Sequence, residues 1–129
     1  MKPTVLIAED VKKFREELHD LLAVEFDVVA AATDGMEAVD LFRELQPELV
    51  VMDIVMPRLS GIEATAQIMR EFPRAKIIIL SGLTDENIVL QALQAGASDY
   101  LFKPADGEKL KQLLLEYSRD GNRSKAQVP

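Results

Sequence analysis

Short apolar runs recur along the chain, and longer segments with a different apolar spacing separate them. The runs are rich in Val and Ile and nearly continuous rather than alternating, which is typical of strands covered on both faces. Strands of that kind belong to parallel sheets. The pattern therefore predicts a buried parallel sheet made from Thr4–Ala8, Val28–Ala32, Leu49–Met52, Lys76–Leu80 and Tyr100–Phe102.

The segments between the runs have helical character. Residues 14–22 and 110–117 carry apolar side chains every three or four positions, as amphipathic helices do. Residues that can cap a helix N-terminus precede the helical segments: Asp34 with Glu37, Ser60 with Glu63, Thr84 with Asn87, and Asp106. Helix ends are expected at Gln46-Pro47, Phe72-Pro73 and Gly96.

Five strand–helix units in succession predict an α/β fold, a doubly wound three-layer sandwich with right-handed crossovers. A five-stranded parallel sheet flanked by five helices favours the flavodoxin-like strand order 2-1-3-4-5, an order taken from that fold class and not from the spacing. Residues 1–118 are expected to form one domain. Residues 119–129 are polar and lack apolar periodicity, so they are interpreted as a tail or the start of a linker.

Composition narrows the function classes. A net charge of −7 repels a phosphate backbone, and no basic stripe appears, so direct nucleic-acid binding by this segment is not expected. The absence of cysteine excludes disulfides and thiolate chemistry. The N-terminal apolar run is too short for a signal peptide or a membrane span, and a cytoplasmic protein without membrane contact is expected.

Polar side chains stand where the predicted strands end. In sheets of this class, ligands bind outside the carboxyl ends of the strands. Three carboxylates, a hydroxyl and an ammonium are expected at that edge: Glu9 and Asp10, Asp53, Ser81, and Lys103. Clustered carboxylates repel one another unless a cation neutralises them. All-oxygen ligands with few direct carboxylates favour Mg²⁺, for which Mn²⁺ can substitute.

Several motifs carry a family resemblance. The stretches VLIAEDV, VVMDIVMP and LSGLTDENIVLQALQAGASDYLFKP, with the D-G-x-E-A at residues 34–38, resemble the CheY-like receiver domains of two-component response regulators. The resemblance runs from about Thr4 to Tyr117. It implies a phosphoacceptor signalling domain rather than an enzyme acting on other substrates.

The resemblance implies a role for each residue at the strand ends. Asp53 is the expected phosphoacceptor, a nucleophile toward the phosphohistidine of a partner kinase. Lys103 and Ser81 are expected to hold phosphoryl oxygens. The expected metal ligands are Asp10 directly, Glu9 through water, Asp53, and the backbone carbonyl of Val55.

Further features follow from the same resemblance. Ser81 and Tyr100 are the expected switch pair, in which the aromatic side chain turns inward as the Ser81 loop moves. The Lys103-Pro104 peptide bond is expected to be cis. Val55 and Leu83, two positions beyond Asp53 and Ser81, cannot orient an attacking water, which predicts slow autodephosphorylation.

The expected partners are a sensor histidine kinase or a phosphotransfer protein. Kinase contact is expected at the first helix, where Lys12, Arg15 and Glu16 are assigned to the outer face, although a solvated face explains these charges equally well. The output face is expected within residues 85–115, and a homodimer formed on phosphorylation is compatible with it. His19 is expected at the surface, outside the chemistry.

Alternatives remain at this stage. A receiver-like interaction module without phosphorylation is the main one. A haloacid-dehalogenase-type phosphatase is discounted because Val55 stands where it needs a second Asp. A flavodoxin-like FMN carrier would need a Ser/Thr-rich phosphate loop after the first strand, and this chain has Glu9-Asp10-Val11-Lys12 there. The C-terminal end resembles receivers joined to NarL/LuxR-type DNA-binding domains, and a free-standing receiver fits equally well.

Overall fold

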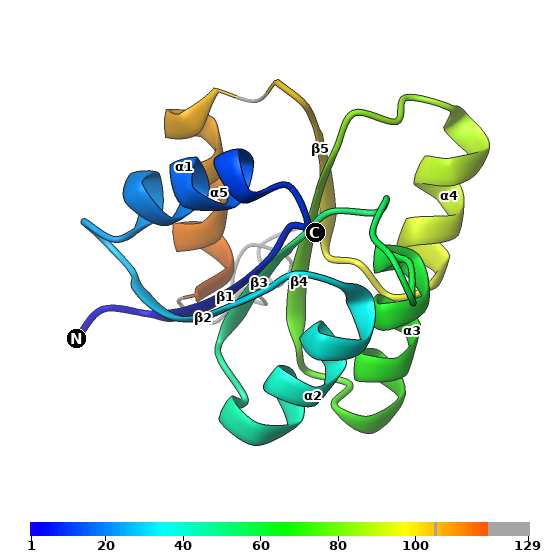
Figure 1. The fold of residues 1–129 in the computed structure, drawn as a ribbon, viewed down its shortest axis with the longest axis horizontal. Helices are drawn as coiled ribbons and strands as arrows, with labels where there is room; N and C mark the ends of the chain where they lie inside the picture. The colour runs from blue at the N-terminus through cyan, green and yellow to red at the C-terminus, as the bar shows by residue number, and fades with distance from the viewer. Residues whose placement is uncertain (105, 119–129) are drawn as a thin grey trace, which may run out of the picture.

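The computed structural model describes residues 1–104 and 106–118, in which strands and helices alternate (Figure 1). The strands are β1 (Thr4–Ala8), β2 (Asp27–Ala32), β3 (Leu49–Met52), β4 (Lys76–Ser81) and β5 (Asp99–Phe102). The helices are α1 (Lys12–Leu22), α2 (Gly35–Leu45), α3 (Gly61–Glu71), α4 (Glu86–Gln94) and α5 (Gly107–Ser118). The predicted tail, residues 119–129, lies outside the described residues.

The strands form one parallel sheet in the order β2-β1-β3-β4-β5, which confirms the predicted fold class and strand order. Helices α1 and α5 cover one face of this sheet, and α2, α3 and α4 cover the other (Figure 1). Two strands match their predicted bounds, and the other three each gain one residue at an end. One of these additions, Ser81, places a predicted site residue inside β4.

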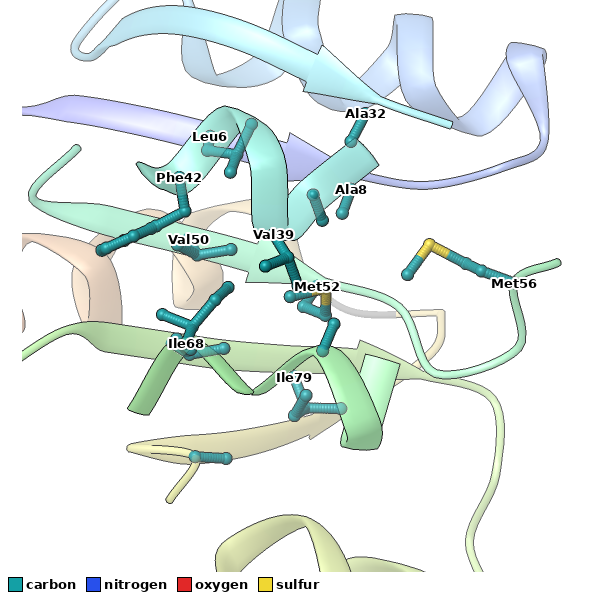
Figure 2. Close-up of a cluster of buried hydrophobic side chains, with 14 of the residues drawn as sticks. Leu6, Ala8, Ala32, Val39, Phe42, Val50, Met52, Met56, Ile68 and Ile79 are labelled. Carbon is teal, nitrogen blue, oxygen red and sulfur yellow. The ribbon is translucent and has the colours of Figure 1, made fainter. Parts of the chain in front are cut away.

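Alternate residues of the central strands pack against opposite layers. In β1, Leu6 and Ala8 belong to the cluster under α2, α3 and α4, whereas Val5 and Ile7 belong to the cluster under α1 and α5. Figure 2 shows the first cluster, in which Ile68 of α3 points toward the sheet. Burial on both faces explains why these strands are continuously apolar in sequence.

The predicted helix caps are mostly confirmed. Ser60 and Glu63 form a capping box at the start of α3, and the Asp34 side chain accepts from the backbone N–H of Glu37 at the start of α2. The cap predicted at Thr84 was wrong by one residue, because Asp85 accepts from the Asn87 N–H at the start of α4.

The helix ends agree with the sequence as well. Gln46 adopts a left-handed conformation at the end of α2, and Phe72 ends α3 before Pro73. Gly96 has a φ of 113° just after α4, a conformation in which glycine meets no steric penalty. Strands β3, β4 and β5 therefore each begin at a defined point after the preceding helix.

None of the described helices is both long and apolar enough to cross a membrane. The longest, α5, has 12 residues, whereas a spanning helix needs about 20 apolar residues.

Candidate functional site

The carboxyl ends of β1 and β3 bring three acidic residues together. Parallel pairing sets Ala8 beside Met52, so Glu9 and Asp53, the next residues on each strand, emerge side by side. Glu9, Asp10 and Asp53 each offer a carboxylate oxygen within 4.8 Å of the others. Glu9 is 1% exposed and Asp53 9% exposed. The predicted acidic cluster is therefore assembled, and two of its members are nearly out of contact with water.

Lys103, which follows β5, completes the cluster. Its Nζ donates to Glu9 Oε1 at 2.7 Å and to Asp53 Oδ2 at 3.0 Å. Its backbone N–H donates to the Ser81 carbonyl at 2.8 Å, which extends the β4–β5 pairing to the edge of the sheet. The Lys103-Pro104 peptide bond is cis, as predicted.

The electrostatics of the site follow from its burial. Burial raises the pKa of Glu9, and the hydrogen bond from Lys103 offsets part of that effect. For Lys103, burial favours the neutral form, but the hydrogen bonds to Glu9 and Asp53 raise its pKa above the ordinary value. Lys103 is thus an ammonium at neutral pH. One ammonium among three carboxyl groups leaves the cluster with unbalanced negative charge when the acids are ionised.

The donor set suits a hard divalent cation. Carboxylate oxygens from three residues lie close enough to share one ion, and oxygen ligands of this kind are those that Mg²⁺ prefers. Asp10 is the most exposed of the three acidic residues, so one side of the cluster is open to solvent. The residues therefore fit a partly hydrated Mg²⁺ rather than a closed, all-protein cage.

Both the backbone and the side chain of Asp53 are hydrogen-bonded. Its backbone N–H donates to the Ala8 carbonyl, and its Oδ1 accepts from the Ile54 N–H at 2.7 Å. The Gly61 N–H donates to the Ile54 carbonyl at 2.8 Å, which ties the loop after β3 to the start of α3. Its second carboxylate oxygen, Oδ2, accepts from Lys103 Nζ, so both side-chain oxygens are hydrogen-bonded to the protein.

Ser81 and Tyr100 are joined through the backbone of Leu83. The Ser81 hydroxyl accepts from the Leu83 N–H at 3.2 Å, and the Tyr100 hydroxyl donates to the Leu83 carbonyl at 2.7 Å. Ser81 is 1% exposed and Tyr100 is half-buried. The two predicted switch residues therefore share one backbone segment, which lies at the start of the β4–α4 loop.

The two predicted lifetime residues have different surroundings. Val55 is 63% exposed in the loop after β3. Leu83 is half-buried and packs against the cluster under α2, α3 and α4. Both have apolar side chains, so neither side chain can hydrogen-bond a water molecule.

Arg15 was assigned wrongly to the outer face of the first helix. Its Nη1 donates to the carbonyls of Glu9 and Asp10 at 2.8 and 3.2 Å, which ties α1 to the β1–α1 loop that carries two of the acidic residues. The signal was present in the sequence, because Arg15 precedes the inward residues Leu18 and Leu22 by three and seven positions.

The other assigned charges on this helix are exposed as expected. Lys12 and Glu16 form a solvent-exposed ion pair at 4.0 Å. His19 is also exposed, beside Asp20 and away from the acidic cluster, in agreement with the prediction.

Comparison with known sequences agrees with this geometry. The family described as "Response regulator receiver domain" matches residues 5–115. The chemotaxis protein CheY of Thermotoga maritima is 38% identical over 92% of this chain and its own full length. The transcriptional regulatory protein DegU of Brevibacillus brevis is 37% identical over 93% of this chain, which spans only 52% of DegU.

Solved structures give the same result. A two-component response regulator of the LuxR family from an Aurantimonas species has a TM-score of 0.87 and 33% identity, covering 93% of this chain and 87% of the other. CheY of Borrelia burgdorferi, solved in a CheX–CheY–BeF₃–Mg²⁺ complex, has a TM-score of 0.83 and 30% identity, covering 88% of this chain and 87% of the other.

Proposed function

The chain belongs to the response regulator receiver domain family and is a receiver of two-component signalling, and on that premise we propose that Asp53 is its phosphoacceptor. The observation that carries the proposal is the contact of Lys103 Nζ with Asp53 Oδ2 at 3.0 Å, within a cluster of three carboxylates. A buried acid with both a cationic partner and a neighbouring cation site is suited to receive an anionic group.

Phosphoryl transfer requires the protein chiefly to position the reacting groups and to neutralise their charge. A carboxylate oxygen of Asp53 attacks the phosphorus of a phosphohistidine, the P–N bond breaks, and an acyl phosphate forms on Asp53. Lys103 moves from its carboxylate contacts to a phosphoryl oxygen, where its compact charge balances the negative charge. Ser81 turns its hydroxyl from Leu83 toward a second phosphoryl oxygen.

We assign Glu9, Asp10, Asp53 and the Val55 carbonyl to a Mg²⁺ site. When bound, Mg²⁺ supplies charge neutralisation at the reacting oxygens. The acidic cluster favours this assignment, and the Borrelia relative was solved together with Mg²⁺. Mn²⁺ is expected to substitute because it accepts the same oxygen ligands.

The signal is proposed to pass through Leu83. Its N–H and carbonyl are bonded to Ser81 and Tyr100 respectively, so withdrawal of the Ser81 hydroxyl changes the segment that holds Tyr100. The affected face includes three exposed apolar side chains on α4 and β5, namely Leu90, Leu93 and Phe102. An output domain, a partner or a second phosphorylated copy is expected to bind there.

The phosphorylated form is expected to be long-lived. Attack on the acyl phosphate needs an oriented water molecule, and neither Val55 nor Leu83 can hydrogen-bond one. Val55→Asn, which adds a hydrogen-bonding side chain at an exposed position, is expected to shorten the half-life. Decay of the phosphorylated mass after removal of the phosphodonor measures it, and a half-life of seconds for the wild type would contradict the assignment.

Its place in the cell follows from this role. We infer a cytoplasmic receiver that is phosphorylated by a histidine kinase or a phosphotransfer protein, with no enzymatic activity beyond its own phosphorylation and dephosphorylation. Residues 119–129 are proposed to be a tail or linker to an output domain. The negative net charge of −7 makes direct DNA contact by this segment unfavourable.

The deciding experiment is phosphorylation by acetyl phosphate with Mg²⁺, followed by intact mass measurement. The wild type should gain one phosphoryl group, and Asp53→Asn, which keeps the shape of the side chain, should gain none. Asp10→Asn should react slowly at any Mg²⁺ concentration that saturates the wild type. Chelation should abolish the reaction.

Asp20→Asn is the matched control because Asp20 is an exposed acid on α1 outside the cluster. It should react as the wild type does. A folded wild-type protein that gains no mass would refute the proposal and favour an interaction module that works without phosphorylation.

A further inference from the structure

Phe14 lies beside the ammonium group of Lys103 at the edge of the site. Lys103 Nζ is 5.3 Å from the centroid of the Phe14 ring, inside the distance of about 6 Å at which an aromatic face attracts a cation. The Phe14 side chain is 46% exposed, although Leu22 on the same helix is completely buried. Core packing therefore does not account for an aromatic ring at this position.

The ring also borders an apolar cavity between α1 and α5. This cavity has a volume of about 400 Å³, and its charged lining residues are Glu9, Glu17 and Lys103. Its apolar lining consists of Phe14, Leu18, Leu21, Leu80, Pro104 and Leu110. Because apolar walls keep the local dielectric constant low, charge interactions at the Lys103 ammonium are stronger here than in open water.

Lys103 has one contact that involves neither of the carboxylates assigned to the Mg²⁺ site. Its long side chain has many rotamers, and its present partners are the carboxylates of Glu9 and Asp53. The Asp53 contact changes when that carboxylate becomes an acyl phosphate. The contact with the Phe14 ring does not depend on the charge of Asp53, so it can keep the ammonium near the site throughout.

We propose that Phe14 is a positioning residue for Lys103 and thereby sets the rate of phosphoryl uptake. The inference rests on the proposed function, since it assigns Lys103 to the phosphoryl group. The aromatic face, rather than apolar bulk alone, carries the effect. Phe14→Tyr and Phe14→Trp should therefore keep the effect, whereas Phe14→Leu and Phe14→Ala should lose it.

The first test measures the second-order rate constant for acetyl phosphate at saturating Mg²⁺. Phe14→Leu is expected to slow uptake about two- to fivefold, the range that corresponds to an exposed cation–π contact. Phe14→Tyr should match the wild type. A Phe14→Leu protein that reacts as fast as the wild type would overturn the proposal, because apolar bulk would then suffice.

A double-mutant cycle asks whether Phe14 acts through Lys103. In a Lys103→Ala background, Phe14→Leu should cause no further loss. An equal loss in both backgrounds would show an independent role and overturn the proposal. Leu45→Ala is the matched control, since Leu45 is 41% exposed at the end of α2. Its rate should be unchanged, and a similar loss there would attribute the effect to surface apolar groups in general.

A spectroscopic measurement separates this inference from the proposed function. The aromatic ring should shift the ε-methylene protons of Lys103 upfield, and the shift should disappear in Phe14→Leu. Identical Lys103 signals in the two proteins would overturn the placement of the ring. Failure of the wild type to take up a phosphoryl group would refute the proposed function, whereas the proton shift tests the contact with Phe14 independently.

Discussion

Gly61 and Gly82 both lie near the residues of the site, but only Gly61 is in close contact with it. A Cβ atom at Gly61 would lie 1.8 Å from the Asp53 carbonyl oxygen, whereas one at Gly82 would have no neighbour within 4 Å. The start of α3 therefore approaches the backbone of Asp53, the proposed phosphoacceptor, so closely that only glycine fits. At Gly82 a residue with a side chain can be accommodated without a steric clash at its Cβ atom.

Gly61→Ala is expected to destabilise the protein by about 1–3 kcal/mol, because the added methyl group must displace backbone. It should also slow phosphoryl uptake, since the displaced backbone belongs to Asp53. Gly82→Ala should be neutral or stabilising by up to about 1 kcal/mol. Urea unfolding and acetyl phosphate uptake measure both, and equal effects of the two substitutions would contradict the expected difference.

Thr65 is the residue at which a substitution should stabilise the fold. It is completely buried in α3, and its hydroxyl has no hydrogen-bond partner within the described part of the chain. A buried hydroxyl without a partner costs about 1–3 kcal/mol, so Thr65→Val should raise the free energy of unfolding by about 1 kcal/mol. Thr65→Ser, which keeps the hydroxyl and loses the methyl group, should lower it. Urea denaturation with an unchanged m-value tests the pair.

At the scale of elements, the start of α2 is tied to the loop that follows β3. Asp34 caps α2 through the Glu37 N–H and also accepts from Arg58 Nε and Nη2, at 3.1 and 3.2 Å. Arg58 has a φ of 67°, a left-handed conformation that is unfavourable for a non-glycine residue. In that conformation Arg58 forms its ion pair with Asp34, which connects the β3–α3 loop to the start of α2.

This connection should weaken in acid. The Glu37 N–H and the Arg58 guanidinium lower the pKa of Asp34 below its ordinary value of 3.8. The ionised carboxylate therefore stabilises the fold above pH 3.8, and this contribution is lost as the pH falls through the lowered pKa. The stability difference between wild type and Asp34→Asn should be constant near neutral pH and shrink below pH 3.8.

Urea unfolding over a pH series measures this difference. Arg58→Gln provides the control, because without the guanidinium the Asp34→Asn difference should depend less on pH. A difference that stays constant down to the acid limit of folding would contradict the assignment of the charge interaction to Asp34.

At the scale of the whole molecule, charge balance at the site is expected to link stability to Mg²⁺ at the proposed metal site. The protein has a net charge of −7, and Lys103 is the ammonium that contacts both Glu9 and Asp53. Removal of that ammonium leaves nearly buried carboxylates facing one another without a positive partner. A divalent cation at the same carboxylates can compensate for this loss.

Lys103→Met is therefore expected to lower the melting temperature in EDTA. Addition of Mg²⁺ should raise the melting temperature of this variant more than that of the wild type, because ligand binding stabilises the folded state. Lys111→Met is the matched control, since Lys111 of α5 pairs with Glu108 on the same helix and with Glu25 in the α1–β2 loop, away from the site. Its response to Mg²⁺ should equal that of the wild type. An equal response in Lys103→Met would contradict the expected compensation.

The sequence was sufficient for the elements of the fold because each element has a local signal. Continuous apolar runs located the strands to within a residue at either end, since both faces of a parallel sheet are buried. The capping box at Ser60 and the glycine at position 96 were equally local. The Thr84 cap was missed because Asp85 offers a better acceptor one residue later, a competition that spacing does not resolve.

The acidic cluster was predictable because the carboxyl ends of parallel strands share one edge, and the motifs carry their family resemblance in sequence. Contacts between distant segments were decided only by the tertiary structure. Three such contacts depend on side-chain directions across separate elements. They are the pairing of Lys103 with both Glu9 and Asp53, the Phe14 ring beside that lysine, and the link from Asp34 to Arg58. Local spacing determines which face a residue takes, whereas packing of the layers determines which residue it meets there.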